Sequence, residues 1–101
     1  MLNQVVIVGR MTHSICKADS IESKDTYLVT LNVPRNMKDE AGMYPVDSIP
    51  VLLVGSIADG VSDHATVGDL LGVKGRLIVI NNTLKLYAEK VTFLSSNKGG
   101  E

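Results

Sequence analysis

The chain has no tryptophan, only one cysteine and few aromatic residues of any kind. Because Cys16 is alone, no disulfide can form within the chain. No apolar run approaches the roughly 18 residues that a membrane span requires, and the N-terminus lacks the basic and apolar regions of a secretory signal. These absences predict a cytoplasmic protein that has no membrane partner.

Signatures of catalysis and of metal binding are missing as well. The sequence contains no G-x-S-x-G, P-loop or paired-carboxylate motif, so no enzymatic activity is predicted. His13 and Cys16 form an H-x-x-C pair, but only His64 and scattered acids remain to complete the four ligands of a structural zinc site. We therefore expect neither a cofactor nor a bound metal.

Positive charge is too scarce for a strongly basic nucleic-acid binder, since the formal net charge of the 101 residues is −1. The charges are unevenly distributed, however. Residues 39–73 contain six acidic residues and no lysine or arginine, whereas residues 1–38 and 74–101 are both net positive. This distribution either places a cationic face opposite an acidic one or is an ordinary solvated surface.

The hydrophobic residues make up 45% of the chain, enough for one core in one domain, and they follow strand-like patterns. Residues 3–10 include four consecutive apolar side chains, so Val5 and Ile7 point to one face while Val6 and Val8 point to the other. Both faces must be covered. We expect one face to meet the core, and Val6 and Val8 to form an oligomer interface or to meet a second layer of the same fold.

The most informative stretch is residues 67–80. Four of its apolar side chains share one parity and are expected in the core: Leu71, Val73, Leu77 and Val79. Lys74 and Arg76 have the opposite parity, so in a strand they project from the same face, which suits an anion. Gly72 and Gly75 predict a bend or a close backbone approach, as a small closed barrel requires.

The other elements are weaker signals. Residues 26–33 alternate as a half-buried strand, and residues 46–54 form another strand. Between them, residues 36–44 have the composition of a long hairpin loop. Residues 11–25 lack a clean period and are expected to be a loop, with a short strand around 14–17.

A short helix is expected at residues 56–65, with Ser56 as its N-cap and Asp59 as an imperfect capping-box partner. A turn at Asn81-Asn82 then leads to a last strand over residues 83–94. The apolar parity of that strand changes partway along, which predicts a bulge near Glu89 or Lys90.

This order, three strands, a short helix and two more strands, is typical of the OB-fold, an all-β fold with a five-stranded barrel and one helix between strands 3 and 4. A plain antiparallel sandwich would not normally carry its only helix at that place. We expect the OB-fold domain to span residues 1–95, with a short polar, disordered tail at 96–101.

Four sequence blocks resemble the bacterial single-stranded DNA-binding proteins. They are MLNQVVIVGR at the start, LNVPR at 31–35, VLLVGSIADGV at 51–61 and GDLLGVKGRL at 68–77, in the order and spacing of that family. The resemblance implies an OB-fold that assembles as a homotetramer and coats single-stranded DNA without strong sequence preference. It also implies roles in replication, recombination and repair, and protein partners from those processes.

The chain departs from the family pattern in several places. The family stacks bases on tryptophan and phenylalanine, but the matching positions here hold Ser48, Val54 and Asn82. A basic pair before the fourth strand is replaced by Thr66-Val67, and the chain ends in NKGGE rather than in an acidic tail that recruits partners. These departures fit a divergent copy from a phage, a plasmid or another mobile element. They also fit a dimeric OB-fold similar to primosomal replication protein N.

Candidate binding residues follow from the family blocks and from side-chain chemistry. Cations in a row can neutralise phosphates, although the same residues could be ordinary surface cations. Tyr44 and Tyr87 are the rings available for stacking, whereas Tyr27 and Phe93 are expected in the core. The predicted nucleic-acid-binding set is Arg10, Arg35, Lys38, Tyr44, Val54, Lys74, Arg76, Asn82, Lys85 and Tyr87.

Two functions from different classes therefore remain open. The cationic strand and the uneven charge favour an oligomeric protein that binds and protects single-stranded DNA. The shortage of aromatic residues favours an OB-fold adaptor of the replication machinery, with weak affinity for DNA.

Overall fold

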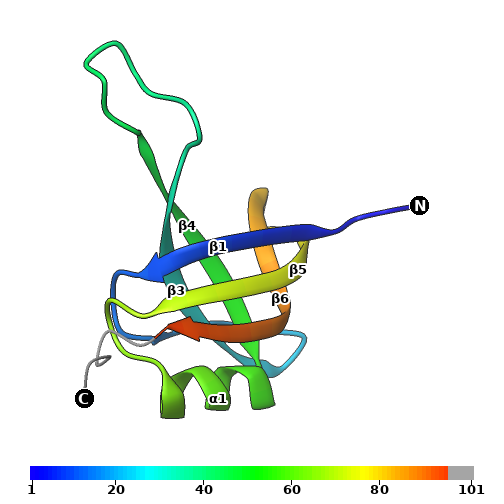
Figure 1. Ribbon diagram of the computed structural model, residues 1–101. Helices are drawn as coiled ribbons and strands as arrows, with labels where there is room; N and C mark the ends of the chain where they lie inside the picture. The colour runs from blue at the N-terminus through cyan, green and yellow to red at the C-terminus, as the bar shows by residue number, and fades with distance from the viewer. Residues whose placement is uncertain (96–101) are drawn as a thin grey trace.

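The computed structural model describes residues 1–95, which form six strands and one helix (Figure 1). In chain order they are β1 (Val5–Met11), β2 (Cys16–Ile21), β3 (Lys24–Pro34), β4 (Val46–Val54), α1 (Ser56–His64), β5 (Leu70–Ile80) and β6 (Thr83–Ser95). The strands form one sheet in the order β1-β5-β6-β4-β3-β2. An additional pairing of β1 with β3, at Arg10 and Met11, closes the sheet into a barrel. The tail predicted at 96–101 lies outside the described residues.

The predicted OB-fold is confirmed. The five barrel strands are β1, β3, β4, β5 and β6, and α1 follows the third of them. The sixth strand, β2, pairs only with β3 and occupies much of the stretch that was expected to be a loop. Glu22 and Ser23 connect these two strands with φ angles of 51° and 65°. Neither residue type signals such a turn, so the hairpin could not be read from the sequence.

The core lies inside the barrel, and its largest fully buried side chains come from three different strands and from α1. These are Leu31, Leu53, Leu71, Val29, Val51 and Val73, together with Val61 of α1. Val5 and Ile7 of β1 pack against this core, whereas Val6 and Val8 are 66% and 45% exposed. The predicted division of β1 into an inner and an outer face is confirmed.

The expectation for the second half of β5 was wrong. Leu77 and Val79, predicted in the core, are 40% and 67% exposed because the β5–β6 hairpin extends beyond the closed part of the barrel. The predicted close approach at Gly75 is confirmed, since a Cβ there would lie 2.1 Å from the carbonyl oxygen of Tyr87. The predicted bulge is also present. Lys74 pairs with Lys90 and Gly75 with Ala88, which leaves Glu89 as the extra residue.

Two local expectations were also wrong. The N-cap of α1 is Gly55, with φ at 66°, and no side chain caps the helix, so Ser56 is its first residue. Phe93, predicted in the core, is 45% exposed and lies edge-on to His64, with 6.1 Å between the ring centroids. The only helix within residues 1–95 is too short and too polar to cross a membrane.

Candidate functional site

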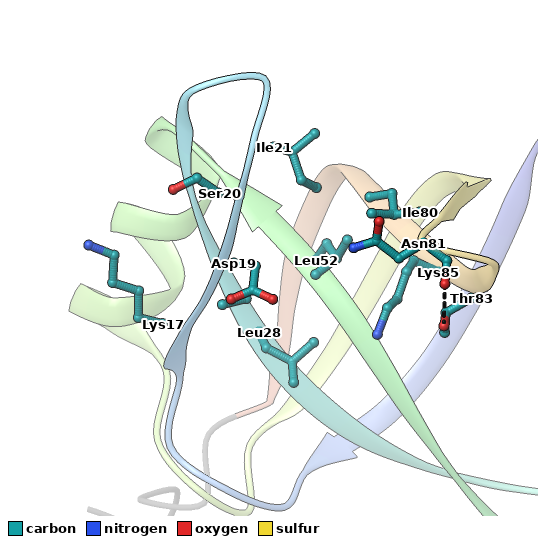
Figure 2. Close-up of a pocket in the computed structure, with 11 residues that line it drawn as sticks. Lys17, Asp19, Ser20, Ile21, Leu28, Leu52, Ile80, Asn81, Thr83 and Lys85 are labelled. Carbon is teal, nitrogen blue, oxygen red and sulfur yellow. Dashed lines mark hydrogen bonds between the residues drawn. The ribbon is translucent and has the colours of Figure 1, made fainter.

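Two hairpins, β2–β3 and β5–β6, enclose a concave surface on the outer side of β3 and β4. Between them lies a groove of about 440 Å³, which we name the Leu52 groove (Figure 2). Leu28 and Leu52, which are cross-strand neighbours on β3 and β4, line its floor. Asp19 lies on the β2 side and Lys85 on the β6 side. The groove therefore combines an apolar floor with charged walls.

A second groove, of about 300 Å³, lies beside the first and is named here the Arg76 groove. It is lined by Ile21, Lys24, Val54, Arg76, Ile80 and Tyr87, among others. The guanidinium carbon of Arg76 lies 5.6 Å from the centre of the Tyr87 ring, a cation–π contact. Because Ile21 and Ile80 line both grooves, the two form one continuous surface.

The β5–β6 pairing explains why these side chains share a face. Residues directly opposite each other in an antiparallel ladder project to the same side. Arg76 is opposite Tyr87, and Ile78 is opposite Lys85. The register is set by the turn at Asn81 and Asn82, whose φ angles of 51° and 61° suit asparagine. One face of this hairpin therefore carries two cations, an aromatic ring and aliphatic side chains to the grooves.

The structure brings part of the predicted binding set together. Arg76, Tyr87 and Val54 line the Arg76 groove, and Lys85 lines the Leu52 groove. Asn82 lies in the turn of the same hairpin. None of the six acidic residues of positions 39–73 lines either groove, although Asp19 lines the Leu52 groove and Glu22 the Arg76 groove.

Lys38 and Tyr44 form a second group in the long loop between β3 and β4, which extends away from the barrel (Figure 1). The Lys38 ammonium lies 5.7 Å from the centre of the Tyr44 ring. The Asp39 carboxylate accepts hydrogen bonds from the backbone N–H groups of Ala41 and Met43, each at 2.9 Å, and so organises the loop tip. This pair is placed apart from the two grooves.

Arg35, at the base of that loop, forms an ion pair with a carboxylate. Its Nε and Nη2 atoms donate hydrogen bonds to the two carboxylate oxygens of Asp47, both at 3.0 Å. The hydrogen bond from Arg35 holds the pKa of Asp47 below its ordinary value of 3.8, and Asp47 in turn raises the pKa of Arg35. Arg35 is therefore largely compensated at neutral pH, although both side chains are exposed to water.

The other two predicted cations lie near β1. Arg10 donates a hydrogen bond of 3.0 Å from Nη1 to the carbonyl oxygen of Gly68. Lys74 is flanked by Val6 on one side and by Lys90 on the other, so it belongs to the outer surface of β1 and β5. Neither cation lines a groove.

Sequence reasoning missed several groove residues, namely Asp19, Ile21, Leu28, Leu52 and Ile80. Ile80 could have been found, since it alternates with Arg76 along β5. Asp19 and Ile21 carried no such signal because their strand was not predicted. Within residues 1–95, no three His, Cys, Asp or Glu side chains gather where they could hold a metal ion.

Comparison with known proteins gives the following matches. Residues 2–93 match the model of the single-strand binding protein family. A single-stranded DNA-binding protein of Staphylococcus epidermidis is 30% identical over the whole chain and 83% of that protein. Single-stranded DNA-binding protein 1 of Clostridium acetobutylicum is 31% identical over 96% of this chain and 97% of that protein. The relative from Streptococcus mutans is 34% identical over 76% of this chain, but only 47% of its own length is spanned.

Solved structures show the same fold at lower identity. The mitochondrial single-stranded DNA binding protein of S. cerevisiae superposes with a TM-score of 0.77 at 14% identity, over 95% of this chain and 97% of that chain. The small single-stranded DNA-binding protein of Streptomyces coelicolor superposes with a TM-score of 0.70 at 18% identity, over 93% of this chain and 95% of that chain. The dimeric N-terminal domain of PriB from Thermoanaerobacter tencongensis superposes with a TM-score of 0.71 at 19% identity, over 93% of this chain and 98% of that chain.

Proposed function

Since the chain belongs to the single-strand binding protein family, we propose that it binds single-stranded DNA along the Arg76 and Leu52 grooves. This location is supported by one observation: Arg76, Tyr87 and Lys85 lie together with aliphatic side chains on one concave surface. Cations that follow a backbone, combined with apolar surface for unstacked bases, are the features that single-strand binding requires.

The two components contribute differently. Arg76 neutralises a phosphate and Lys85 adds positive charge beside the strand, so this component of the affinity falls with salt and does not depend on sequence. Tyr87 is the only aromatic ring among the residues that line the two grooves, so bases rest mainly on Leu28, Leu52 and the isoleucines. Stacking on an aromatic ring is worth about 1–3 kcal/mol per base. Affinity is therefore modest, and electrostatics supply more of it than in a site with several rings.

We also propose that the chain forms a homo-oligomer through β1. On one side β1 pairs with β5 from Val5 to Arg10, whereas on the other it meets β3 only at Arg10 and Met11. The free edge next to Val6 and Val8 can accept another strand, and both valines are exposed. A second copy that pairs there would cover the edge and the two valines, as a first step to the tetramer that the family resemblance implies.

In this role the protein acts by occlusion, because a bound strand can neither re-anneal nor meet a nuclease. We place this activity in the cytoplasm, in replication, recombination and repair, alongside proteins of those processes. A second candidate, a replication adaptor with weak DNA affinity, is favoured by two observations. Tyr87 is the single aromatic ring in the grooves, and the PriB domain shares the fold.

Fluorescence anisotropy of labelled oligo-dT over a salt series tests the choice. We expect Tyr87→Ala to weaken binding by at least fivefold, from the loss of about 1–3 kcal/mol of stacking, and to leave the salt slope unchanged. Leu84→Ala is the matched control, since Leu84 is 61% exposed on the other face of the same hairpin. A wild-type salt slope near zero, or equal effects of the two variants, would favour the adaptor.

A further inference from the structure

Two acidic residues line the surface proposed for a polyanion, Glu22 in the Arg76 groove and Asp19 in the Leu52 groove, and Asp19 is the one that faces a cation across an apolar floor. The Asp19 carboxylate lines the Leu52 groove, where it would repel any phosphate that passes close by. Its position follows from a β-bulge. Ala18 pairs with Thr26 and Ile21 with Lys24, so Asp19 and Ser20 together are opposite Asp25 alone. Bulges redirect side chains beside binding sites, and this one brings Asp19 to the groove.

The surroundings of Asp19 leave its carboxylate available. Figure 2 shows Asp19 on one wall and the Lys85 ammonium on the other, with Leu28 and Leu52 between them. Neither charged side chain forms a hydrogen bond or ion pair with any of residues 1–95. Lys17, which also lines the Leu52 groove, pairs at 3.7 Å with Asp25 instead. The groove thus presents an acceptor wall and a donor wall on either side of an apolar floor.

From this arrangement, and resting on the proposed function, we infer that the Leu52 groove is a base-reading site that prefers guanine. The Watson–Crick edge of guanine places two adjacent donors, N1–H and the N2 amino group, beside the O6 acceptor. Asp19 can accept from both donors while Lys85 donates to O6, and the ring lies on Leu28 and Leu52. Unstacked bases of single strands are commonly read on this edge.

The other bases match the two walls less well. Thymine has a single N–H between two carbonyl oxygens, so a carboxylate would face an acceptor on either side of it. Cytosine and adenine each present one amino donor next to an unprotonated ring nitrogen. A site that offers hydrogen-bond partners disfavours a ligand that leaves them unpaired. The carboxylate thus lowers affinity for oligo-dT and raises affinity for strands that contain guanine.

Competition between oligonucleotides tests this preference. Strands of about twelve nucleotides suit the ~4–16 that an OB-fold occupies. They would be all-dT, repeats of dT-dT-dG in which no two guanines are adjacent, and the same repeats with deoxyinosine, which lacks the N2 amino group. We expect wild-type protein to bind the guanine strand about tenfold more tightly than all-dT, with inosine between them. This comparison uses unaltered protein, so it does not depend on the folding of any variant.

Asp19→Asn is the matching protein variant, and Asp63→Asn on α1 is its control because it removes the same charge outside both grooves. Asp19→Asn should bind all-dT more tightly than wild type and lose most of the guanine preference, whereas Asp63→Asn should keep the preference. Equal affinity of wild type for all three strands, or equal preference in the two variants, would overturn the inference and leave the proposed function standing. Failure of the wild type to bind any strand would overturn both.

Discussion

The two halves of β5 carry similar residues but form two different surfaces. In the first half, Leu71 and Val73 fill the core and Lys74 lies next to Val6 on the outer surface of β1 and β5. In the second half, the strand leaves the barrel and Arg76 lies against Tyr87 in a groove. The two cations are only two positions apart and have the same parity. Their surroundings therefore differ because different strands lie beside them.

The division between the halves has a structural cause at Gly75. The backbone of β6 lies so close there that no side chain fits, and the bulge at Glu89 shifts the pairing at the same point. A bulge increases the local twist of its strand. The side chains before and after it consequently meet different neighbours, which separates the surface proposed for self-association from the surface proposed for DNA.

The largest effect is expected from filling the space at Gly75. In Gly75→Ala the new Cβ would lie 2.1 Å from a backbone oxygen, so the β5–β6 ladder must shift, and we expect the free energy of unfolding to fall by about 3 kcal/mol. Gly72→Ala is the control on the same strand, since its Cβ would lie 3.4 Å from the movable Leu94 side chain and should cost less than about 1 kcal/mol. Urea denaturation measures both. Similar losses would show that Gly75 does not divide the strand.

The second-largest effect is expected from a negative charge at Val6, beside the free edge of β1, which should weaken self-association. We expect Val6→Asp to raise the dissociation constant of self-association about 100-fold, equivalent to about 2.7 kcal/mol, because the new carboxylate would be buried at a strand edge. Met43→Asp is the control, as both side chains are 66% exposed in the single chain. Sedimentation velocity should show the 10.8 kDa monomer for the first variant alone. A monomeric wild type would refute the assignment of this surface.

The two cations of β5 offer the sharpest test of the comparison. Arg76→Ala should weaken binding to oligo-dT about tenfold at low salt and flatten the log–log salt slope by about 0.7, the value for one phosphate contact on a single strand. Lys74→Ala should leave the slope nearly unchanged, because Lys74 belongs to the other surface. Fluorescence anisotropy over a salt series measures both slopes. Equal changes of slope in the two variants would mean that the DNA contacts both halves of β5.

The smallest effect is expected from releasing Arg35. Since the pKa of Asp47 is lowered, the ion pair stabilises the fold above pH 3.8, the ordinary value for this carboxyl, and is lost as the pH falls through the lowered pKa. Asp47→Asn removes the pair at neutral pH and should raise affinity for oligo-dT about threefold, with a slope steeper by up to about 0.7. Asp63→Asn on α1 controls for the general change in charge. A drop in affinity would show that the pair positions Arg35 for DNA.

Much of the fold could be predicted from the sequence, because local patterns of residues indicate its strands, turns and bulge. The alternation in β3, the two-faced β1, the turn at Asn81-Asn82 and the bulge at Glu89 all appeared where expected. The β2–β3 hairpin could not be predicted, since Glu22 and Ser23 are not residue types typical of a turn with positive φ angles. The wrong expectations for Leu77 and Val79 share one cause: alternation shows the side of a strand but not where the barrel ends.

The sequence by itself determined the residue types available for binding: several cations, very few rings and alternating aliphatic side chains, because composition and parity are properties of the chain alone. Only the tertiary structure decided which of them lie together. It joined Arg76 with Tyr87, separated Lys74 from both, paired Arg35 with Asp47 and brought Asp19 opposite Lys85. These outcomes depend on register, on a bulge and on contacts between hairpins distant in sequence, so no local pattern contains them.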